Sequence, residues 1–234
     1  MYCEEYYKEL IARQKIEDMH IHPRPNCFSL EVLSNYIDIC MKLGINRIGF
    51  VEHGRRVMKT RRGILENKED LICYMQAIRT VKKRYSSIEI KSGIEIDYSE
   101  DSLFMQNMLW ECSGNCKLDF VIGSVHGFGK RKYIEYINAV LDLVNNYDID
   151  ILGHFILKEE IVEYWLIVEE ILKLLQEKDI ALEFNKAERY NCKNIELKEM
   201  FLKKVFEYRV RWTSGSDAHS YKELVENNSR NWLS

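Results

Sequence analysis

The stretch IEDMHIH, at Ile16–His22, decides the fold class of this chain. It is a run of strand length, and it ends in two histidines. Residues 30–41 follow it with apolar side chains at helical spacing, and Gly44 is placed to end that helix. The same alternation of a short apolar run and a longer amphipathic stretch recurs along the rest of the sequence.

Seven such runs are predicted as strands: Ile16–His22, Arg47–His53, Ile88–Asp97, Asp119–His126, Asp150–Phe155, Ile180–Asn185 and Val210–Ser216. Helices are predicted over residues 30–41, 68–85, 101–112, 133–146, 159–177 and 195–208, with a short one from residue 221. Strictly alternating strands and helices imply a parallel sheet, and strands rich in Ile, Val and Phe are typical of a sheet buried on both faces. An open doubly wound sheet and a closed barrel both have this element order.

The positions of the six histidines favour the closed barrel. In a closed βα barrel the C-terminal ends of the strands meet on one face, whereas an open sheet spreads them along an edge. Each histidine lies at or just beyond the C-terminal end of a predicted strand, so a barrel gathers all of them into one cleft. They are His20, His22, His53, His126, His154 and His219.

Carboxylates occur at matching positions. Glu95 lies near the end of the third predicted strand, and Asp217 lies two residues before His219. Residues i and i+2 of a strand point to the same side, so the pairs His20/His22 and Asp217/His219 can each chelate a metal from one strand end. Six imidazoles and two carboxylates exceed the four ligands of a single zinc ion, which indicates two or three metals that share ligands.

Neighbouring residues leave alternatives open. Asp18, two residues before His20, is expected either to bind a metal or to orient a ligand by accepting a ring N–H. Glu52 points to the opposite strand face from His53, and we expect it to be structural or to act on a ligand. A single histidine such as His154 could instead be a hydrogen-bonded structural residue.

Length and composition exclude several classes of protein. The chain has 234 residues, of which 46% are hydrophobic and 30% charged, as in a globular protein rather than a disordered one. Its net charge of −3 argues against binding to nucleic acid through bulk charge. No apolar stretch is long enough for a membrane helix, and the charged start lacks the apolar core of a signal peptide. The seven cysteines form no disulfide framework, so we expect reduced thiols in a cytoplasmic protein.

Six short motifs around the histidines and carboxylates occur in order along the chain: DMHIH at Asp18–His22, VEH at Val51–His53, GIEIDY at Gly93–Tyr98, GSVH at Gly123–His126, DILGHF at Asp150–Phe155 and GSDAH at Gly215–His219. Together they resemble the PHP (polymerase and histidinol phosphatase) superfamily, and the likeness is closest to its histidinol-phosphatase-like branch. The likeness spans nearly the whole chain, from about Ile16 to Leu224.

The resemblance implies a distorted seven-stranded (β/α)7 TIM-like barrel, of class α/β, in a single domain over residues 15–234. Residues 1–14 would form an extension that packs on the barrel. The cofactors implied are two or three divalent ions of manganese, iron or zinc, with Glu95 bridging two of them. Glu95, Asp217 and His219 are the residues that we expect to take part in catalysis. The implied ligands are His20, His22, His53, Glu95, His126, His154, Asp217 and His219.

The function expected is that of a metal-dependent phosphatase in which a metal-bridging hydroxide attacks a small phosphorylated metabolite. Histidinol phosphate is the first substrate to consider, which implies a place in histidine biosynthesis. Arg189, in the loop after the sixth predicted strand, is the first candidate for binding the phosphate dianion, and Lys158 and Arg55 are further candidates. The oligomeric state is left open.

Two other functions remain open. A phosphodiesterase or exonuclease acting on nucleic-acid ends is supported locally by the basic run Arg55–Arg62. A catalytically weakened binding module is suggested by departures from the PHP pattern. The loop after His22 lacks a further histidine or acidic ligand, for which Asn26 or Cys27 could substitute, and Ile156 stands where the pattern often has aspartate. The chain after GSDAH is also short.

Overall fold

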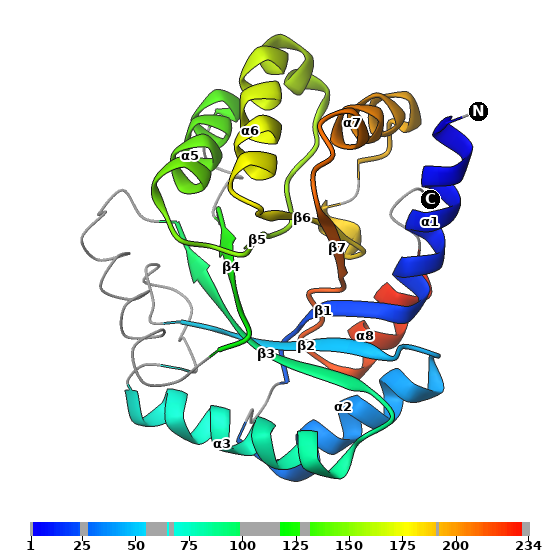
Figure 1. The fold of residues 1–234 in the computed structure, drawn as a ribbon, viewed down its shortest axis with the longest axis vertical. Helices are drawn as coiled ribbons and strands as arrows, with labels where there is room; N and C mark the ends of the chain where they lie inside the picture. Colours follow the sequence, from blue (N-terminus) through cyan, green and yellow to red (C-terminus); the bar gives the residue numbers. More distant parts are fainter. Residues whose placement is uncertain are drawn as a thin grey trace.

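The computed structural model describes residues 2–23, 28–54, 65, 68–98, 118–126, 132–190 and 192–230. Within these residues, seven parallel strands form one sheet in chain order, from β1 to β7. A parallel bridge joins Ile21 to Ala218, and the His22 N–H donates to the Ala218 carbonyl at 2.9 Å. These contacts bring the first strand next to the last, so the sheet curls into a nearly closed barrel (Figure 1). The predicted α/β TIM-like barrel is confirmed.

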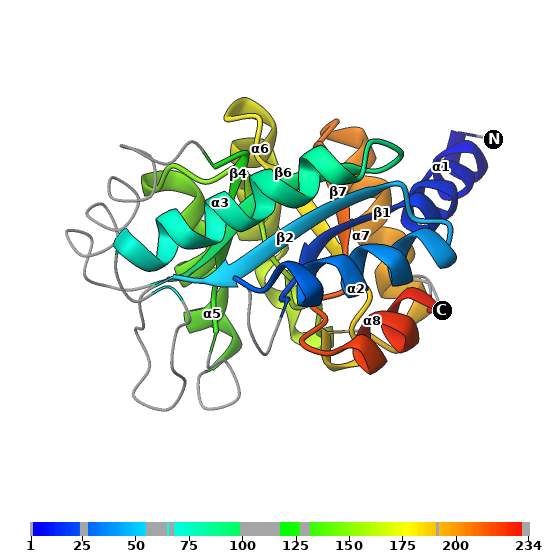
Figure 2. The same cartoon turned by 90° about the horizontal axis from the view of Figure 1, so that it is seen from below.

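Among the described residues, strands and helices alternate except between the third and fourth strands, and the helices lie around the outside of the barrel (Figures 1 and 2). The strands are β1 (Glu17–Ile21), β2 (Arg47–His53), β3 (Glu89–Asp97), β4 (Phe120–Ser124), β5 (Ile151–Leu152), β6 (Ala181–Asn185) and β7 (Trp212–Gly215). The helices are α1 (Tyr2–Ile16), α2 (Leu30–Lys42), α3 (Lys68–Arg84), α5 (Tyr133–Asn146), α6 (Trp165–Glu177), α7 (Ile195–Glu207) and α8 (Tyr221–Asn228), with 3-10 turns η2 (Glu159–Tyr164) and η3 (Glu188–Tyr190).

Helix α2 shows how local sequence sets the element boundaries. It begins where the Ser29 side chain accepts a hydrogen bond from the Val32 N–H at 3.3 Å, as an N-cap should. It ends before Gly44, whose φ of +78° suits glycine and ends the helix as predicted. Its buried side chains belong to the main hydrophobic core: Leu33, Tyr36, Ile37 and Cys40.

A packed plug of apolar side chains fills part of the barrel interior. It comes from five strands and is separate from the larger core between sheet and helices: Met19, Val51, Phe120, Ile122, Ile151 and Ala181. Glycines make room for it, because a Cβ on Gly93 would lie 2.5 Å from the Phe120 ring. Barrels of this kind have a filled interior, so the functional chemistry has to lie at an end of the barrel.

Three predicted elements differ from the structure. Strand β5 is only two residues long, because the chain leaves the sheet before His154, whose φ is +26°. The helix predicted over residues 159–177 is divided into η2 and α6. The helix predicted over residues 101–112 lies outside the described residues.

Helix α1 was not expected from the sequence. It runs without a break to Ile16, and β1 begins at the next residue. Leu10 is fully buried, and the Arg13 guanidinium lies 4.7 Å from the centre of the Trp212 ring. The buried Lys186 donates to the carbonyl of Gln14 at 3.2 Å, which places a cation at the C-terminal end of α1. Tertiary contacts therefore hold this helix against the barrel.

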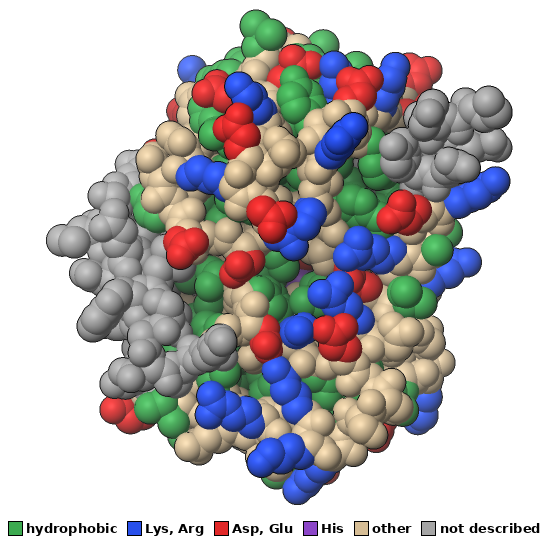
Figure 3. Space-filling model, viewed as in Figure 1, with side chains coloured by type: hydrophobic (Ala, Val, Ile, Leu, Met, Phe, Trp, Pro, Cys, Tyr) green, Lys and Arg blue, Asp and Glu red, His purple; other side chains and the backbone are tan. Residues whose placement is uncertain are grey.

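Charged side chains are mixed on the surface. On the face in Figure 3, Lys and Arg are interspersed with Asp and Glu over the described elements, rather than gathered into one basic area. Within the described residues, no helix combines the length and the apolar character that crossing a membrane would require. The cysteines whose side chains are described are free thiols: Cys40, Cys73 and Cys192.

Asp119 should make a pH-dependent contribution to stability. It accepts hydrogen bonds from Lys82 (2.5 Å) and from the N–H of Ser92 (2.7 Å), and so links α3, β3 and the start of β4. Burial raises the pKa of Asp119, but Lys82 and Ser92 outweigh it and hold the pKa below its usual value.

Folding lowers the pKa of Asp119. Its contribution to the free energy of unfolding is therefore fully present above the unfolded-state pKa and is lost as the pH falls through the folded-state pKa. Asp119→Asn should lower the free energy of unfolding by about 1 kcal/mol at neutral pH, and the difference should narrow below about pH 4. Urea denaturation across this pH range measures it. A difference that stays constant with pH would contradict the assignment.

Candidate metal centre

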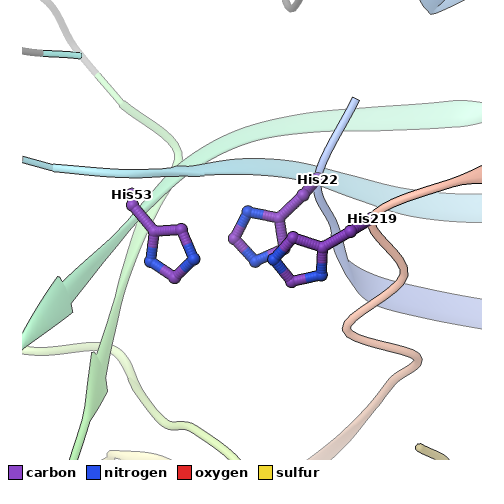
Figure 4. A group of neighbouring side chains, drawn as sticks. All are labelled: His22, His53 and His219. Atoms are coloured by element: carbon purple, nitrogen blue, oxygen red, sulfur yellow. The ribbon is translucent and has the colours of Figure 1, made fainter. Parts of the chain in front are cut away.

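The six histidines lie together at one end of the barrel. His20 is in β1, His53 is the last residue of β2, and the others follow within four residues of β1, β4, β5 or β7. The ring centres of His22 and His219 are 4.2 Å apart, and those of His22 and His53 are 4.5 Å apart. Figure 4 shows these three rings side by side. Strand ends far apart in sequence thus meet as the barrel prediction requires.

Glu95 lies between two groups of imidazoles. Its Oε2 is 2.9 Å from His53 Nδ1 and 3.4 Å from His22 Nε2. Its Oε1 is 3.0 Å from His154 Nε2 and 3.5 Å from His126 Nε2. Each carboxylate oxygen therefore faces a different pair of rings, which is the arrangement that a bridging ligand needs.

Asp217 faces the same pocket from the segment after β7. Its Oδ1 is 3.2 Å from His22 Nε2 and 3.7 Å from His20 Nε2, while its Oδ2 pairs with Arg189. Asp217 has a φ of +48°, an uncommon conformation for a residue that is not glycine. The His219 ring contacts the backbone of Asp217, with its Nδ1 2.9 Å from the Asp217 carbonyl oxygen.

The pocket is buried at its base and open at its rim. His20, His22 and Glu95 have 1% exposure or less. The side chains of His53, His126 and His219 are 13%, 16% and 20% exposed. The rim is therefore partly exposed to solvent, while the candidate ligands at the base are shielded from water.

The charges of the buried carboxylates dominate the electrostatics. Burial alone lowers the pKa of His20, but Glu183, Glu95 and Asp217 outweigh it and raise this pKa well above its usual range. Burial also lowers the pKa of His22. The hydrogen bond with Asp217 and the contacts to Glu52 and Glu95 outweigh this effect and raise the pKa to about 10. The pocket therefore favours cations, whether these are protons on the imidazoles or metal ions.

The same balance applies to the acids. Burial raises the pKa of Glu95, but the surrounding imidazoles, His53 first, hold it well below its usual value. Burial is outweighed in the same way at Asp217, where His20 and His22 depress the pKa. Both carboxylates are thus ionised and able to act as metal ligands.

The donor atoms fit divalent transition metals. Among the described residues, three groups each hold ligand atoms within 4.8 Å of one another: His22, His53 and His219; His20, His22 and Glu95; and Glu95, His126 and His154. Imidazole nitrogens with carboxylate oxygens suit zinc, iron and manganese. The groups share His22 or Glu95, so ions held there would share ligands.

Two carboxylates that the sequence analysis did not single out contact these histidines. Asp97 accepts a hydrogen bond from His126 Nδ1, and Glu183 Oε1 lies 2.8 Å from His20 Nδ1. Both could have been noticed in the sequence as acidic residues inside predicted buried strands. Asp97 lies two residues after Glu95, and Glu183 lies in the stretch IALEFN. Carboxylates that accept the second ring N–H commonly orient metal-binding histidines.

Asp18 takes neither of its expected roles. Its Oδ1 accepts hydrogen bonds from the N–H groups of His20 (3.3 Å) and Ser216 (2.9 Å), and its Oδ2 accepts from Asn228 at 2.7 Å. It therefore ties the backbone of β1 to the end of β7 instead of contacting an imidazole ring. Glu52, by contrast, is buried with its Oε2 3.8 Å from His22 Nδ1.

The three candidate phosphate-binding residues differ in where they lie relative to the pocket and in whether the structure describes them. Arg189 lies beside the pocket, where it pairs with Asp217. Lys158 is exposed at the residue before η2, and its role in binding phosphate stays a prediction. Arg55 lies outside the described residues, as do Asn26 and Cys27, the expected substitutes for a missing ligand.

Comparison with known families decides the classification. The pattern that defines the PHP domain matches residues 18–187. This chain belongs to the PHP domain family. The match includes the candidate ligands from His20 to His154, while Asp217 and His219 lie beyond it. Membership supports a metal-dependent phosphoesterase and agrees with the histidine-lined end of the barrel.

One solved structure agrees closely with this fold. Histidinol phosphate phosphatase from Lactococcus lactis, solved with zinc, L-histidinol and phosphate, superposes with a TM-score of 0.72 at 22% identity, covering 94% of this chain and 92% of that one. An Arabidopsis N6-mAMP deaminase is similar at a TM-score of 0.45 and 10% identity, covering 96% of this chain and 86% of that one, which is too weak to bear on function. No curated protein sequence matches.

Proposed function

We propose that this PHP-family chain is a metal-dependent phosphatase that hydrolyses a small phosphomonoester, with a histidinol phosphate-like molecule as the first candidate. The observation that carries the proposal is the meeting of six imidazoles, Glu95 and Asp217 at one end of the barrel, with the Arg189 guanidinium beside them. The ligands of the similar Lactococcus lactis phosphatase, L-histidinol and phosphate, support this substrate class. A role in histidine biosynthesis and a cytoplasmic location belong to the same proposal.

The candidate ligands would hold two or three divalent ions, which when bound supply a nucleophile at neutral pH and neutralise charge on the phosphoryl group. Glu95 would keep the two groups of imidazoles at a fixed separation, since its two oxygens face different rings. His219, whose side chain is 20% exposed at the rim, is placed to deliver the proton that a leaving alkoxide needs, and the ionised Asp217, whose Oδ1 lies 3.6 Å from His219 Nδ1, would stabilise the protonated ring.

Arg189 is placed to bind the phosphate of a substrate. Its side chain is 47% exposed, and its guanidinium lies 4.9 Å from the centre of the Tyr190 ring. That ring stacks on His154 at 4.3 Å. A guanidinium can bind a phosphate dianion through two parallel hydrogen bonds. A phosphate approaching the rim would therefore meet a cation whose position is set by Tyr190 and Asp217.

Arg189→Ala should lower kcat/KM by roughly 10- to 100-fold, mainly by raising KM, because it removes charge-assisted hydrogen bonds to the phosphate. Arg189→Lys should recover part of the loss, since it restores the charge without the planar fork. Steady-state kinetics on the best substrate measures both. Arg211→Ala is the matched control, because Arg211 precedes β7 and pairs with Asp179 instead. An unchanged KM in Arg189→Ala would contradict the assignment.

A panel of phosphorylated metabolites tests the proposed function directly. The purified protein, loaded separately with manganese, iron or zinc, should release phosphate from at least one small monoester, and histidinol phosphate is the first to try. His20→Ala should lose this release. A protein that holds bound metal but releases phosphate from none of these substrates would overturn the proposal.

Two further measurements separate this function from the two alternatives. The basic run Arg55–Arg62 that suggested action on nucleic-acid ends lies outside the described residues. Degradation of labelled oligonucleotides in place of monoester hydrolysis would favour that function. Elemental analysis showing well under two metals per chain would favour a binding module.

A further inference from the structure

Glu183 is a buried carboxylate in the middle of β6. It is 3% exposed, and all five residues of its strand are buried. A carboxylate in such a place is costly unless charged or polar groups compensate it. The partners of Glu183 therefore indicate why an acid stands in a fully buried strand.

Each oxygen of Glu183 contacts a different candidate metal ligand. Its Oε1 is 2.8 Å from His20 Nδ1, and its Oε2 accepts a hydrogen bond from the backbone N–H of His154 at 2.5 Å. One carboxylate on β6 thus engages a ring from β1 and the backbone that follows β5.

The contact with His20 sets which ring nitrogen faces the pocket. When Nδ1 carries the hydrogen that Glu183 accepts, Nε2 is the nitrogen left to bind a metal. That Nε2 lies 3.1 Å from His22 Nε2, 3.6 Å from Glu95 Oε2 and 3.7 Å from Asp217 Oδ1. The hydrogen bond therefore directs the ligand atom of His20 into the centre of the pocket.

The contact with His154 supports a strained backbone. His154 has a φ of +26°, a region that residues with a side chain rarely occupy and that surrounding structure must maintain. In this conformation its Nε2 lies 3.0 Å from Glu95 Oε1. The N–H bond to Glu183 is one contact that holds the backbone there.

Gly215 provides the space for this arrangement. A Cβ at this position would lie 1.8 Å from Glu183 Oε1 and 2.7 Å from the Cβ of His20. The carboxylate therefore occupies a position that the last strand accommodates only because residue 215 is glycine.

We propose that Glu183 is a positioning residue that orients His20 through Nδ1 and fixes the backbone of His154, so that both rings present Nε2 to the metals. The inference deepens the proposed function and rests on it in one respect, namely that His20 and His154 bind metal. Glu183 acts through these two residues and is not itself assigned contact with substrate.

Glu183→Gln tests the proposal, because it keeps the shape of the side chain and removes its charge. We expect metal affinity, measured by competition with a chelator, to fall by about 10- to 100-fold. The nitrogen-15 NMR signals of His20 in the zinc-loaded protein should also change, since a neutral amide offers one acceptor oxygen to the two N–H groups that the carboxylate satisfies at His20 and His154. The second readout would not move if Glu183 had only a structural role.

Glu17→Gln is the matched control. Glu17 is a buried carboxylate on β1, 1% exposed, that binds Thr213, the Ser214 N–H and Arg47. We expect a comparable loss of stability in thermal unfolding, with metal affinity and the His20 signals unchanged. Metal affinity in Glu183→Gln equal to that of the wild type would overturn the positioning role.

The wild-type protein provides a test that does not depend on the variant folding. Its zinc-loaded form should show the hydrogen of His20 on Nδ1, and a hydrogen on Nε2 would overturn the proposal. Metal binding that depends on Glu183 in a protein inactive on every phosphomonoester would refute the proposed function alone. A wild-type chain that takes up no divalent metal would overturn both.

Discussion

Replacing Glu95 with glutamine should lower kcat/KM on the best phosphomonoester by roughly 1,000-fold or more and remove most of the bound metal, an effect beyond the 10- to 100-fold typical of residues that only support ligands. The carboxylate is 1% exposed, and its oxygens face His53 and His22 on one side and His154 and His126 on the other. An amide keeps the shape, but it removes the negative charge and adds an N–H donor. Both groups of candidate ligands are therefore affected at once.

Elemental analysis and steady-state kinetics measure this effect together. Glu89→Gln is the control, because Glu89 is on the same strand, is 50% exposed, and pairs with Arg47 and Lys91 instead of histidines. It should retain metal and activity. A Glu95→Gln protein with its full metal content and near wild-type kcat/KM would show that Glu95 is not a ligand.

Gly215→Ala should have the second large effect, this time on both stability and metal binding. The added Cβ would lie 1.8 Å from Glu183 Oε1, so the carboxylate must leave its position between His20 and His154. Overpacking a filled interior commonly costs 1–3 kcal/mol, and displacing a buried carboxylate from its partners adds to this. We expect a loss of about 3 kcal/mol or more in the free energy of unfolding.

Chemical denaturation and chelator competition on the same samples measure both parts. Gly123→Ala is the control, since the atoms nearest to its Cβ belong to the apolar side chains of Ile149 and Leu143, at 2.9 Å and 3.2 Å, and not to a carboxylate. It should cost less and leave metal affinity unchanged. A Gly215→Ala protein as stable as the wild type would mean that Glu183 can move without consequence.

Much of the fold could be predicted because it depends on local periodicity. Strand β2 and helix α5 have the predicted bounds, and the other predicted boundaries that the structure describes are mostly within one or two residues. Helix α1 was missed because its position depends on contacts made elsewhere, such as the burial of Leu10. Strand β5 was predicted too long because apolar content does not show where a backbone turns. Here the backbone turns away from the sheet before His154.

The candidate site was also partly predictable. Histidines that follow strands can be recognised in a sequence, and the geometry of a parallel barrel implies that they meet. The role of Asp18 was not predictable, because its partners, Ser216 and Asn228, come from the far end of the chain. The position of Arg189 beside the pocket likewise became known only from its pairing with Asp217.

The sequence by itself determined the alternation of strands and helices, the parallel barrel and the set of histidines and acids at its strand ends. These features follow from side-chain periods that repeat within a few residues. Only the tertiary structure decided which carboxylate faces which imidazole. His20 and Glu183 are 163 positions apart, and their contact exists because the sheet closes on itself and Gly215 leaves room between them. No local pattern carries that information.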